Sequence, residues 1–350
     1  MADPMSGSLR PHRAARAEAR LHALIDRRLR ARGWTPRVVP YVGYGTDRWV
    51  RVLARVVLAP PTSRHGEDAD GRGWRRFLSA SAAGVPVTIQ VGEHRHVVTS
   101  VRDGYLDVRL ESDLQPGWNT VRLATEGAEP VDEPVRVVGP SDGLGLVSDI
   151  DDTIMVTMLP RPLLALRNAF LVRESKRRPV PGMAELYSEI IEAHPEVFVA
   201  YLSTGAWNTA EALRDFMARH GYPPGPLLLT DWGPTQTGWF RSGQDHKREQ
   251  LRGLFKDLPQ LRWLLVGDDG QHDPSVYSEA AAAEPDRVLG VLIRQLSATE
   301  QVVSSGTPVP KDAAADTGGA IGESPVLAGD GFGLRQRLRE RNLVPGLGAP

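Results

Sequence analysis

The second half of the sequence alternates between short, continuous apolar runs and segments with helical spacing of their apolar residues. Helical segments such as GMAELYSEIIEA separate the runs. Strands that are apolar on both faces and joined by helices are typical of a parallel sheet covered on both sides. The sequence therefore predicts an α/β fold with a Rossmann-like, five-stranded parallel sheet, whose strands are LGLVS, VFVAYLS, PLLLT, WLLVG and VLGVLIR.

The region before this one has a different pattern. From Trp49 to Val138 the apolar residues alternate with polar ones in short runs, and Asp103, Gly104 and Gly117 are turn signals. Runs spaced about 10 residues apart are typical of antiparallel strands in a sandwich. We therefore expect a small antiparallel β-sandwich domain ahead of the parallel sheet.

The N-terminal region predicts a basic amphipathic helix. Its opposite face is mostly arginine, and the narrow apolar stripe contains no Trp or Phe, which favours docking on the next domain over contact with a membrane surface. The second interpretation stays open. The stripe consists of Leu21, Leu24, Ile25 and Leu29.

The C-terminal region beyond Ser297 is rich in Ala, Gly, Pro and Ser, and has too few apolar residues to offset the entropy of ordering. We expect a mostly disordered tail, in which Gly333–Leu343 could form a short basic helix. The predicted organisation is the N-terminal helix, the small β-sandwich domain, the α/β domain and the tail, over residues 1–33, 34–140, 141–297 and 298–350.

Composition excludes several classes of chemistry. The chain has no cysteine, so thiolate nucleophiles and cysteine-ligated metals are absent. A net charge of −1 gives no broad attraction to nucleic acid, and no nucleic-acid partner is expected. We find neither a secretory signal nor a run of about 18 apolar residues. The expected location is cytoplasmic, with peripheral membrane contact left open.

Three carboxylates directly follow the first apolar run. Buried charges at the end of a strand cost several kcal/mol unless a cation or hydrogen bonds compensate them. Asp149 and Asp151 are separated by one residue, so in an extended strand end their side chains point the same way, whereas Asp152 points elsewhere. We expect Asp149 and Asp151 to act together and Asp152 to be structural.

A second acidic group follows the run WLLVG. It consists of Asp268 and Asp269, with Asp273 five positions after Asp268. Because open α/β sheets place their ligands at the carboxyl ends of the strands, we expect both acidic groups at one edge. Oxygen ligands without cysteine or regularly spaced histidine suit Mg²⁺. The two acidic groups together therefore predict a magnesium site.

Polar residues with phosphate-binding chemistry complete the set. Ser203 and Thr204 end the second apolar run, where a hydroxyl could donate to a phosphoryl oxygen, and we prefer Ser203 for this role without excluding Thr204. Lys247 opens a helix and could balance a phosphate's charge. His246 and His272 flank the site in sequence, and a structural hydrogen bond explains each at least as well as a substrate contact.

The order of these residues resembles the four motifs of haloacid dehalogenase superfamily phosphohydrolases. The motifs read Asp149-x-Asp151-x-Thr153, Ser203, Lys247 and Gly267-Asp268-x-x-x-x-Asp273. More narrowly, SDIDDTI, HGYPPGPLLLTDW, DHK and VGDDGQHDPSVYSEAA resemble the phosphatidate phosphatase family of the yeast actin-patch-associated type, over residues 143–296. VPYVGYGTDRWVRVLARV resembles the start of the small β domain of bacterial members.

The resemblance implies a haloacid dehalogenase-like fold without a large cap and assigns catalytic roles. Asp149 would be the nucleophile that forms an aspartyl-phosphate, and Asp151 the general acid and then the general base. Thr153 would tighten the turn, Ser203 would bind the phosphoryl group and Lys247 would neutralise it. These residues would make the chain a phosphatase.

The resemblance also implies the metal and the substrate. Asp268, with Asp149 and the backbone carbonyl of Asp151, would bind Mg²⁺, and Asp273 would support it. The implied substrate is a phosphorylated lipid, phosphatidate, which would yield diacylglycerol and phosphate. The alternatives are a phosphatase for another phosphomonoester or a phosphoprotein, and a catalytically weak lipid-binding module.

The segment between the first two motifs bears on the substrate. Residues 160–180, PRPLLALRNAFLVRESKRRPV, are too few for a large cap, so we expect an open site. Its leucines and arginines would suit an acyl chain and an anionic headgroup. A helix whose leucines pack on the sheet explains them about equally well.

Overall fold

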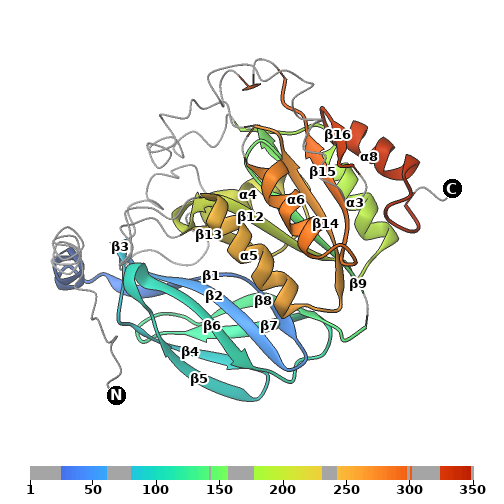
Figure 1. Ribbon diagram of the computed structural model, residues 1–350. Helices are drawn as coiled ribbons and strands as arrows, with labels where there is room; N and C mark the ends of the chain where they lie inside the picture. The colour runs from blue at the N-terminus through green and yellow to red at the C-terminus, as the bar shows by residue number, and fades with distance from the viewer. Residues whose placement is uncertain are drawn as a thin grey trace, which may run out of the picture.

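The computed structural model contains two large β-sheets that pack against each other (Figure 1). A third, small sheet consists of β10 Met155–Val156 paired with β11 Arg178–Pro179. Sheet A is built from the first part of the chain and lies in the lower half of this view, whereas sheet B and its helices lie above it. The structure describes residues 25–60, 80–141, 143–156, 177–230, 243–270, 272–297, 300–301 and 324–347.

Sheet A has eight strands in the order β3-β2-β1-β8-β7-β4-β5, with β6 paired to β2. It is mixed, because β1 and β8 pair in parallel while its other pairs are antiparallel. The sheet curls around one apolar core. Its strands are β1 Thr35–Thr46, β2 Trp49–Ala59, β3 Ala80–Ser81, β4 Pro86–Val91, β5 His94–Thr99, β6 Tyr105–Glu111, β7 Gly117–Ala124 and β8 Val131–Val138.

Sheet B has six parallel strands in the order β13-β12-β9-β14-β15-β16. The five predicted apolar runs lie in β9, β12, β13, β14 and β15. The sixth strand, β16, comes from the region for which the sequence predicted a disordered tail. The strands are β9 Gly143–Asp149, β12 Phe198–Ala206, β13 Leu227–Thr230, β14 Leu261–Asp268, β15 Val288–Arg294 and β16 Val326–Ala328.

The fold class predicted from the sequence is therefore wrong. Instead of a small antiparallel sandwich, the first part of the chain forms one curled, mixed sheet, and the parallel sheet has six strands rather than the five of the expected haloacid dehalogenase-like arrangement. The alternation of apolar and polar residues indicates strands with one buried face, but it does not report which strands pair or whether the sheet closes on itself.

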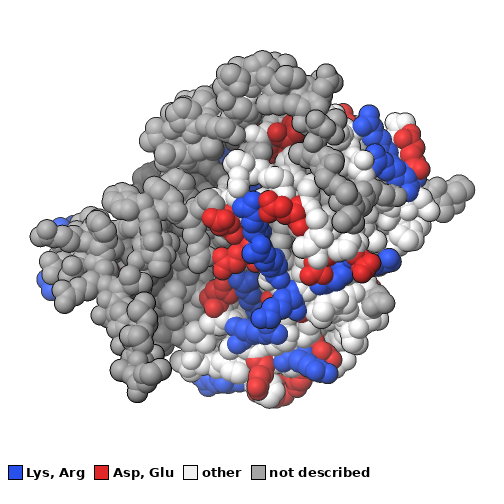
Figure 2. All heavy atoms as spheres, in the orientation of Figure 1, with Lys and Arg blue, Asp and Glu red and all other residues white. Residues whose placement is uncertain are grey.

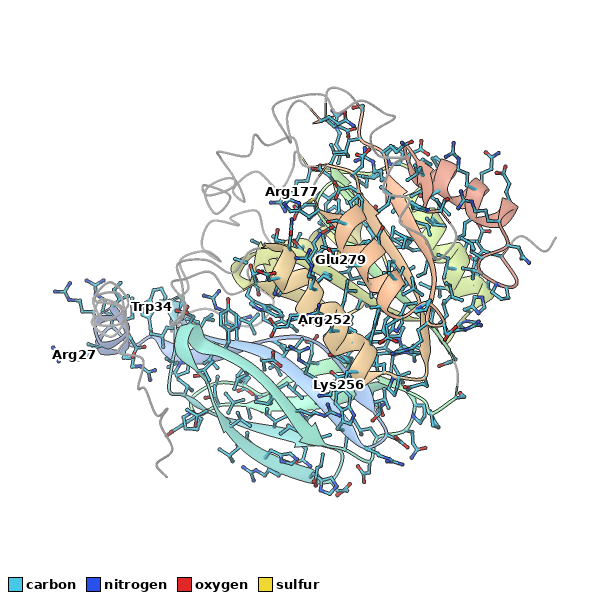
Figure 3. All side chains as sticks on the ribbon, in the orientation of Figure 1. Arg27, Trp34, Arg177, Arg252, Lys256 and Glu279 are labelled. Atoms are coloured by element: carbon cyan, nitrogen blue, oxygen red, sulfur yellow. The ribbon has the colours of Figure 1, made fainter. Side chains whose placement is uncertain are left out.

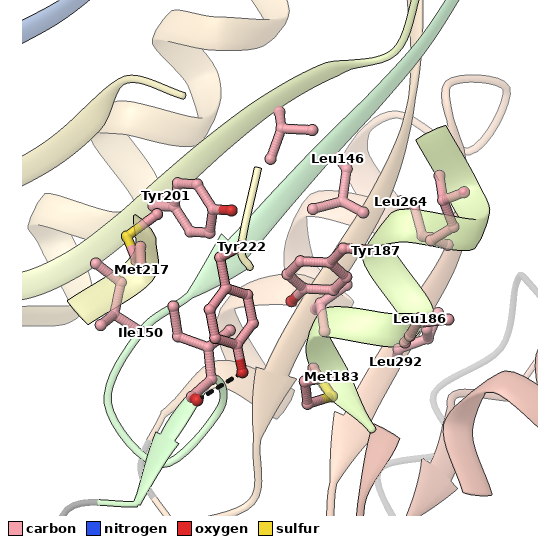
Figure 4. Packing of buried hydrophobic residues seen from close by; sticks show 14 of the residues in the cluster. Leu146, Ile150, Met183, Leu186, Tyr187, Tyr201, Met217, Tyr222, Leu264 and Leu292 are labelled. Carbon is pink, nitrogen blue, oxygen red and sulfur yellow. Dashed lines mark hydrogen bonds between the residues drawn. The ribbon is translucent and has the colours of Figure 1, made fainter. Parts of the chain in front are cut away.

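Helices cover both faces of sheet B. Neighbouring residues of one strand serve opposite faces, because Leu146 packs with α3, α4 and α8, while Val147 packs with α5 and α6. Figure 4 shows part of the first of these cores. The helices are α3 Met183–Ala193, α4 Ala210–Arg219, α5 Gly243–Asp257, α6 Asp273–Ala283 and α8 Gly331–Glu340.

The outer face of α5 carries a stripe of basic side chains, with acidic side chains on its flanks (Figure 2). Arg252 and Lys256 are exposed on this helix, and Lys256 lies at the end nearest sheet A (Figure 3). Arg248 Nε pairs with Glu279 Oε2 on α6 at 2.7 Å. The surface is thus mixed in sign here, which agrees with the small net charge.

The C-terminal region differs from the expectation, because part of the predicted disordered tail forms β16 and α8. Of the predicted N-terminal helix, residues 25–31 are helical, Leu29 packs on the core of sheet A, and the remainder lies outside the described residues. At the other end, β16 extends sheet B and α8 covers it, where Leu334 is fully buried. No helix among the described residues is long and apolar enough to span a membrane.

The sheets are joined through buried contacts as well as through the chain from β8 to β9. Tyr44 of β1 is fully buried, and its ring lies 5.6 Å from that of Phe198 on β12. Its hydroxyl donates to Asp257 Oδ2 at 3.1 Å, at the C-terminal end of α5. Arg109 of β6 donates to the other oxygen of Asp257 at 2.9 Å. Sheet A thereby holds α5 in place.

Candidate functional site

The carboxyl ends of three neighbouring strands carry the polar residues of the site. Strand β9 ends at Asp149, β14 ends at Asp268, and Ser203 lies near the end of β12. In the register of the sheet, Leu202 lies opposite Asp149, and Val266 lies opposite Ser148. Parallel pairing therefore brings these side chains to one edge.

Three carboxylates meet at this edge. One oxygen from each of Asp149, Asp268 and Asp273 lies within 4.8 Å of the others, and all three residues are buried. Asp149 and Asp268 are the last residues of their strands, whereas Asp273 is the first residue of α6. The structure thus brings together acidic residues that are more than a hundred positions apart in the sequence.

Lys247 lies between two of these carboxylates. It is in the second turn of α5, is 3% exposed, and donates from Nζ to Asp149 Oδ1 at 2.7 Å and to Asp273 Oδ1. Thr153 Oγ1 donates to the other oxygen of Asp149 at 3.1 Å. The nucleophile candidate therefore has both carboxylate oxygens fixed by hydrogen bonds.

Asp151 has a different environment. Its carboxylate is not one of the three that cluster in the described part of the chain, and its Oδ2 accepts a 3.0 Å hydrogen bond from Ser203 Oγ. The backbone N–H of Gly205 donates to Ser203 Oγ at 2.9 Å. The side chain of Asp151 is thus held by Ser203, and its predicted contact with a metal, through the backbone carbonyl, stays a prediction.

Thr204 faces another direction from Ser203. Its methyl group would lie 2.7 Å from a Cβ placed on Gly243, at the start of α5, and its carbonyl accepts from Thr230 Oγ1 at 2.9 Å. Ser203, in contrast, is fully buried beside Asp151. Of the two hydroxyls that the sequence left open, that of Ser203 donates to a carboxylate of the site, Asp151.

The electrostatics of the site are dominated by burial. Burial raises the pKa of Asp149 to about 8; Lys247 opposes this, whereas Asp273 and Asp151 add to it. Burial also raises the pKa of Asp268 well above its ordinary value, and Asp273 and Asp149 contribute. Burial alone would lower the pKa of Lys247, but Asp149 and Asp273 raise it above the ordinary value. With all three carboxylates ionised, the single ammonium of Lys247 would leave negative charge in excess, and this is why burial and mutual repulsion raise the pKa values of Asp149 and Asp268.

The donor set fits a hard divalent cation. Asp273 Oδ2 is buried and has no hydrogen-bond partner among the described residues, and buried polar atoms in proteins are nearly always paired. The clustered ligand atoms are all carboxylate oxygens, which Mg²⁺ and similar cations prefer. A divalent ion bound by Asp149, Asp268 and Asp273 would satisfy this oxygen and balance the excess charge.

Buried tyrosines hold the turn that carries the first acidic residues. Tyr222 donates from its hydroxyl to the carbonyl of Ile154 at 2.8 Å, the contact drawn in Figure 4. Tyr187 Oη and Ser148 Oγ share a 2.6 Å hydrogen bond. Sequence reasoning missed both tyrosines, because nothing in the local pattern distinguishes a core tyrosine from one that supports a site.

Asp152 contributes its backbone to the turn after β9, and its structural role stays a prediction. It adopts a left-handed φ of 60°, and its backbone N–H donates to the carbonyl of Met155 at 2.8 Å. His246 is buried, with Nε2 3.4 Å from the carbonyl of Leu228, and His272 is the residue before α6. The contact of His246 with Leu228 therefore favours a structural hydrogen bond over a substrate contact.

Sheet A also reaches this region. Tyr41 of β1 stacks on Trp207, which follows β12, with ring centroids 4.9 Å apart.

The basic and apolar segment between the first two motifs lies largely outside the described residues, which end at Val156 and resume at Arg177.

A known family matches the part of the chain that contains the site. Residues 144–295 match the family model for the catalytic domain of phosphatidate phosphatase APP1. All eight residues predicted for the site fall in this range.

Two curated relatives are similar to the chain. Phosphatidate phosphatase APP1 of Saccharomyces cerevisiae is 29% identical over 197 residues, which cover 55% of this chain and 33% of the yeast protein. An uncharacterized protein of Schizosaccharomyces pombe is 23% identical over 156 residues, which cover 44% of this chain and 26% of that protein. The match thus spans a third or less of each relative.

Solved structures give only a weak likeness. PhoD has a TM-score of 0.31 at 10% identity, over 75% of this chain and 71% of that chain. A carbohydrate acetylesterase from Xanthomonas citri has a TM-score of 0.27 at 9% identity, over 76% of this chain and 73% of that chain.

Proposed function

We propose that the chain is a Mg²⁺-dependent phosphatase that hydrolyses phosphatidate through an aspartyl-phosphate on Asp149. The observation that carries the proposal is the buried group of Asp149, Asp268 and Asp273 around Lys247, inside the range that matches a phosphatidate phosphatase catalytic domain. Carboxylates with shifted pKa values that meet a lysine ammonium at the carboxyl ends of the strands are typical of catalytic sites.

Asp149, Asp268 and Asp273, with the backbone carbonyl of Asp151, would hold the cation. When bound, it would offset the repulsion between an anionic nucleophile and the phosphate. Lys247 keeps one oxygen of Asp149 oriented, which leaves the carboxylate fixed for attack.

In the first step, an oxygen of Asp149 forms a bond to phosphorus while the bond from phosphorus to the glycerol oxygen breaks. Asp151, protonated at the start, gives its proton to that leaving oxygen, so diacylglycerol departs as the neutral alcohol. The hydrogen bond from Ser203 to Asp151 Oδ2 fixes the carboxyl group.

In the second step, Asp151 accepts a proton from water, whose oxygen attacks the phosphorus. The bond to Asp149 breaks, and inorganic phosphate is released. Asp151 is again protonated and Asp149 again a carboxylate, so the cycle closes without any other reactant.

The lipid substrate is supported by similarity to the yeast phosphatidate phosphatase. A direct test measures Mg²⁺-dependent phosphate release from phosphatidate vesicles, a water-soluble phosphomonoester and a phosphopeptide. We expect the highest kcat/KM on phosphatidate. A clear preference for the phosphopeptide would replace the lipid substrate but keep the reaction.

Two substitutions test the reaction itself. We expect Asp149→Asn and Asp151→Asn to lower kcat by about 10⁴-fold or more, as removal of groups that take part in bond formation does. Asp132→Asn is the matched control, because Asp132 is a hydrogen-bonded aspartate of β8 that pairs with Arg122 of β7 in sheet A. Acid quenching with labelled substrate should place phosphate on the peptide that contains Asp149. Retained turnover in Asp149→Asn would contradict the covalent mechanism.

A further inference from the structure

Arg294 is the last residue of β15 and is 4% exposed. Its guanidinium donates in three directions: from Nη1 to the carbonyl of Asp152 at 2.7 Å, from Nε to the carbonyl of Gly329 at 3.2 Å, and from Nη2 to Glu300 Oε1 at 2.7 Å. One side chain therefore joins the turn after β9 to two segments near the C-terminal end of the chain.

The backbone of Arg294 reaches the second acidic turn. Arg294 lies opposite Asp268 in the register of β14 and β15, and its carbonyl accepts from the N–H of Asp269 at 3.0 Å. The turn that begins at Asp149 and the turn that begins at Asp268 thus both contact this residue.

The turn after β9 requires such support. Asp152 has a φ of 60°, which costs of order 1 kcal/mol for a residue with a side chain and persists only where surrounding contacts fix it. Its carbonyl accepts the charged donor of Arg294, and charge-assisted hydrogen bonds are the stronger ones. A planar guanidinium offers donors in several fixed directions, which a lysine does not.

We propose that Arg294 is a positioning residue. It fixes the turn of Asp149 to Thr153 against β14, so that Asp149 and Asp268 face one cation, and it makes this geometry depend on Glu300 and Gly329. The assignment rests on the proposed function for its catalytic consequence, but its structural consequence can be measured without turnover.

The experiment uses the full chain with Arg294→Gln, Arg294→Lys and a control, Arg287→Gln. Arg287 also donates to backbone carbonyls, those of Leu258 at 3.0 Å and Leu261 at 3.4 Å, but at the opposite edge of sheet B. Three quantities are compared: hydrogen–deuterium exchange of peptides covering residues 144–156, Mg²⁺ affinity by calorimetry without substrate, and kcat and KM for phosphate release.

For Arg294→Gln we expect faster exchange in the turn, and a loss of about 10-fold or more in both Mg²⁺ affinity and kcat, the size seen for residues that orient metal ligands. KM should change little, since Arg294 is 4% exposed and its guanidinium already donates to three acceptors of the protein. Arg294→Lys should recover part of the affinity through its charge. Arg287→Gln should leave exchange in the turn, Mg²⁺ affinity and kcat as in the wild type, whatever its unfolding temperature.

The possible outcomes separate the two proposals. Unchanged exchange in Arg294→Gln overturns the positioning role, whether or not the wild type is a phosphatase. Faster exchange with unchanged Mg²⁺ affinity and kcat also overturns it, because the turn would then not govern the site. Faster exchange with weaker Mg²⁺ binding supports the role even if no phosphate is released by the wild type, in which case only the proposed function fails.

Discussion

Buried charge is the feature that sets the behaviour of single residues in this protein. The ammonium of Lys247 is enclosed with the carboxylates of Asp149 and Asp273, away from solvent. Such a group stabilises the fold little, because desolvation offsets most of the attraction, but removal of one partner leaves an uncompensated charge. The arrangement is better explained by the chemistry it supports than by its contribution to stability.

Glu133 of β8 is a second buried carboxylate, and it predicts a pH dependence of stability. Burial raises its pKa from 4.5 to about 7, and Arg214, 3.7 Å away, opposes the shift. The folded state therefore holds this proton more tightly than the unfolded state does. Between pH 4.5 and about 7 the free energy of unfolding should fall as pH rises, by about 3 kcal/mol from this group.

Urea unfolding of the wild type and Glu133→Gln across this pH range measures the effect. The difference between the two proteins should grow with pH up to about 7 and then stay constant. Glu129→Gln, at an exposed position of the loop before β8, should show no such trend. Parallel curves for wild type and Glu133→Gln would contradict the raised pKa.

The residues of the site could be predicted where chemistry follows a strand directly. Asp149 and Asp268 each end an apolar run, and parallel strands bring such ends to one edge. Tyr222 and Arg294 could not be predicted, because each supports the site through a contact with a backbone carbonyl far away in sequence. A carbonyl acceptor leaves no mark in the residue type that carries it.

At the scale of elements, α8 and α3 pack through two glycines. A Cβ on Gly331, the first residue of α8, would lie 2.1 Å from the carbonyl carbon of Gly182, the residue before α3. Because the neighbour is backbone rather than a flexible side chain, it cannot move aside without shifting a helix. The close approach lets Leu334 and Leu338 reach the core.

Gly331→Ala should therefore displace α8. We expect a loss of about 1–3 kcal/mol in the free energy of unfolding, as for overpacked interiors, and faster hydrogen exchange in residues 324–340. Gly329→Ala is the matched control, since a Cβ there would have no atom within 4 Å. It should change stability by less than about 1 kcal/mol. Equal effects of the two substitutions would show that the close packing has no consequence.

Elements were predictable in proportion to their length and regularity. The apolar runs of sheet B are found as strands, whereas β16 has only three residues in a region of low apolar content, so no periodic pattern marks it. The parallel pairing of β1 with β8 joins, in the middle of sheet A, the strands that come first and last in the sequence of that sheet. Alternation within each strand carries no information about such a pairing, and this is why the sandwich was wrongly expected.

For the whole molecule, we expect the two sheets to unfold together, because buried residues of both pack in one core at their junction. Tyr44 lies at this junction, packed on Phe198 and hydrogen-bonded to Asp257. Tyr44→Ala removes a fully buried aromatic ring, a change that costs about 3–5 kcal/mol. We expect calorimetry to show one transition for the wild type and two for Tyr44→Ala, because the sheets no longer stabilise each other.

Trp118→Ala provides the comparison, because Trp118 is an aromatic residue of sheet A that is 49% exposed. It should keep a single transition and lose less stability than Tyr44→Ala. A single transition in Tyr44→Ala, at nearly the wild-type temperature, would mean that the sheets are coupled elsewhere.

Helix α5 connects the junction of the two sheets to the site. Near its start, Lys247 donates to Asp149, and at its end Asp257 accepts from Tyr44 and Arg109 of sheet A. The two positions are ten residues apart, a span of about 15 Å along the helix. One end of the helix is thus bound to sheet A and the other carries the ammonium of the site. A displacement of sheet A relative to sheet B would therefore change the position of Lys247 relative to Asp149.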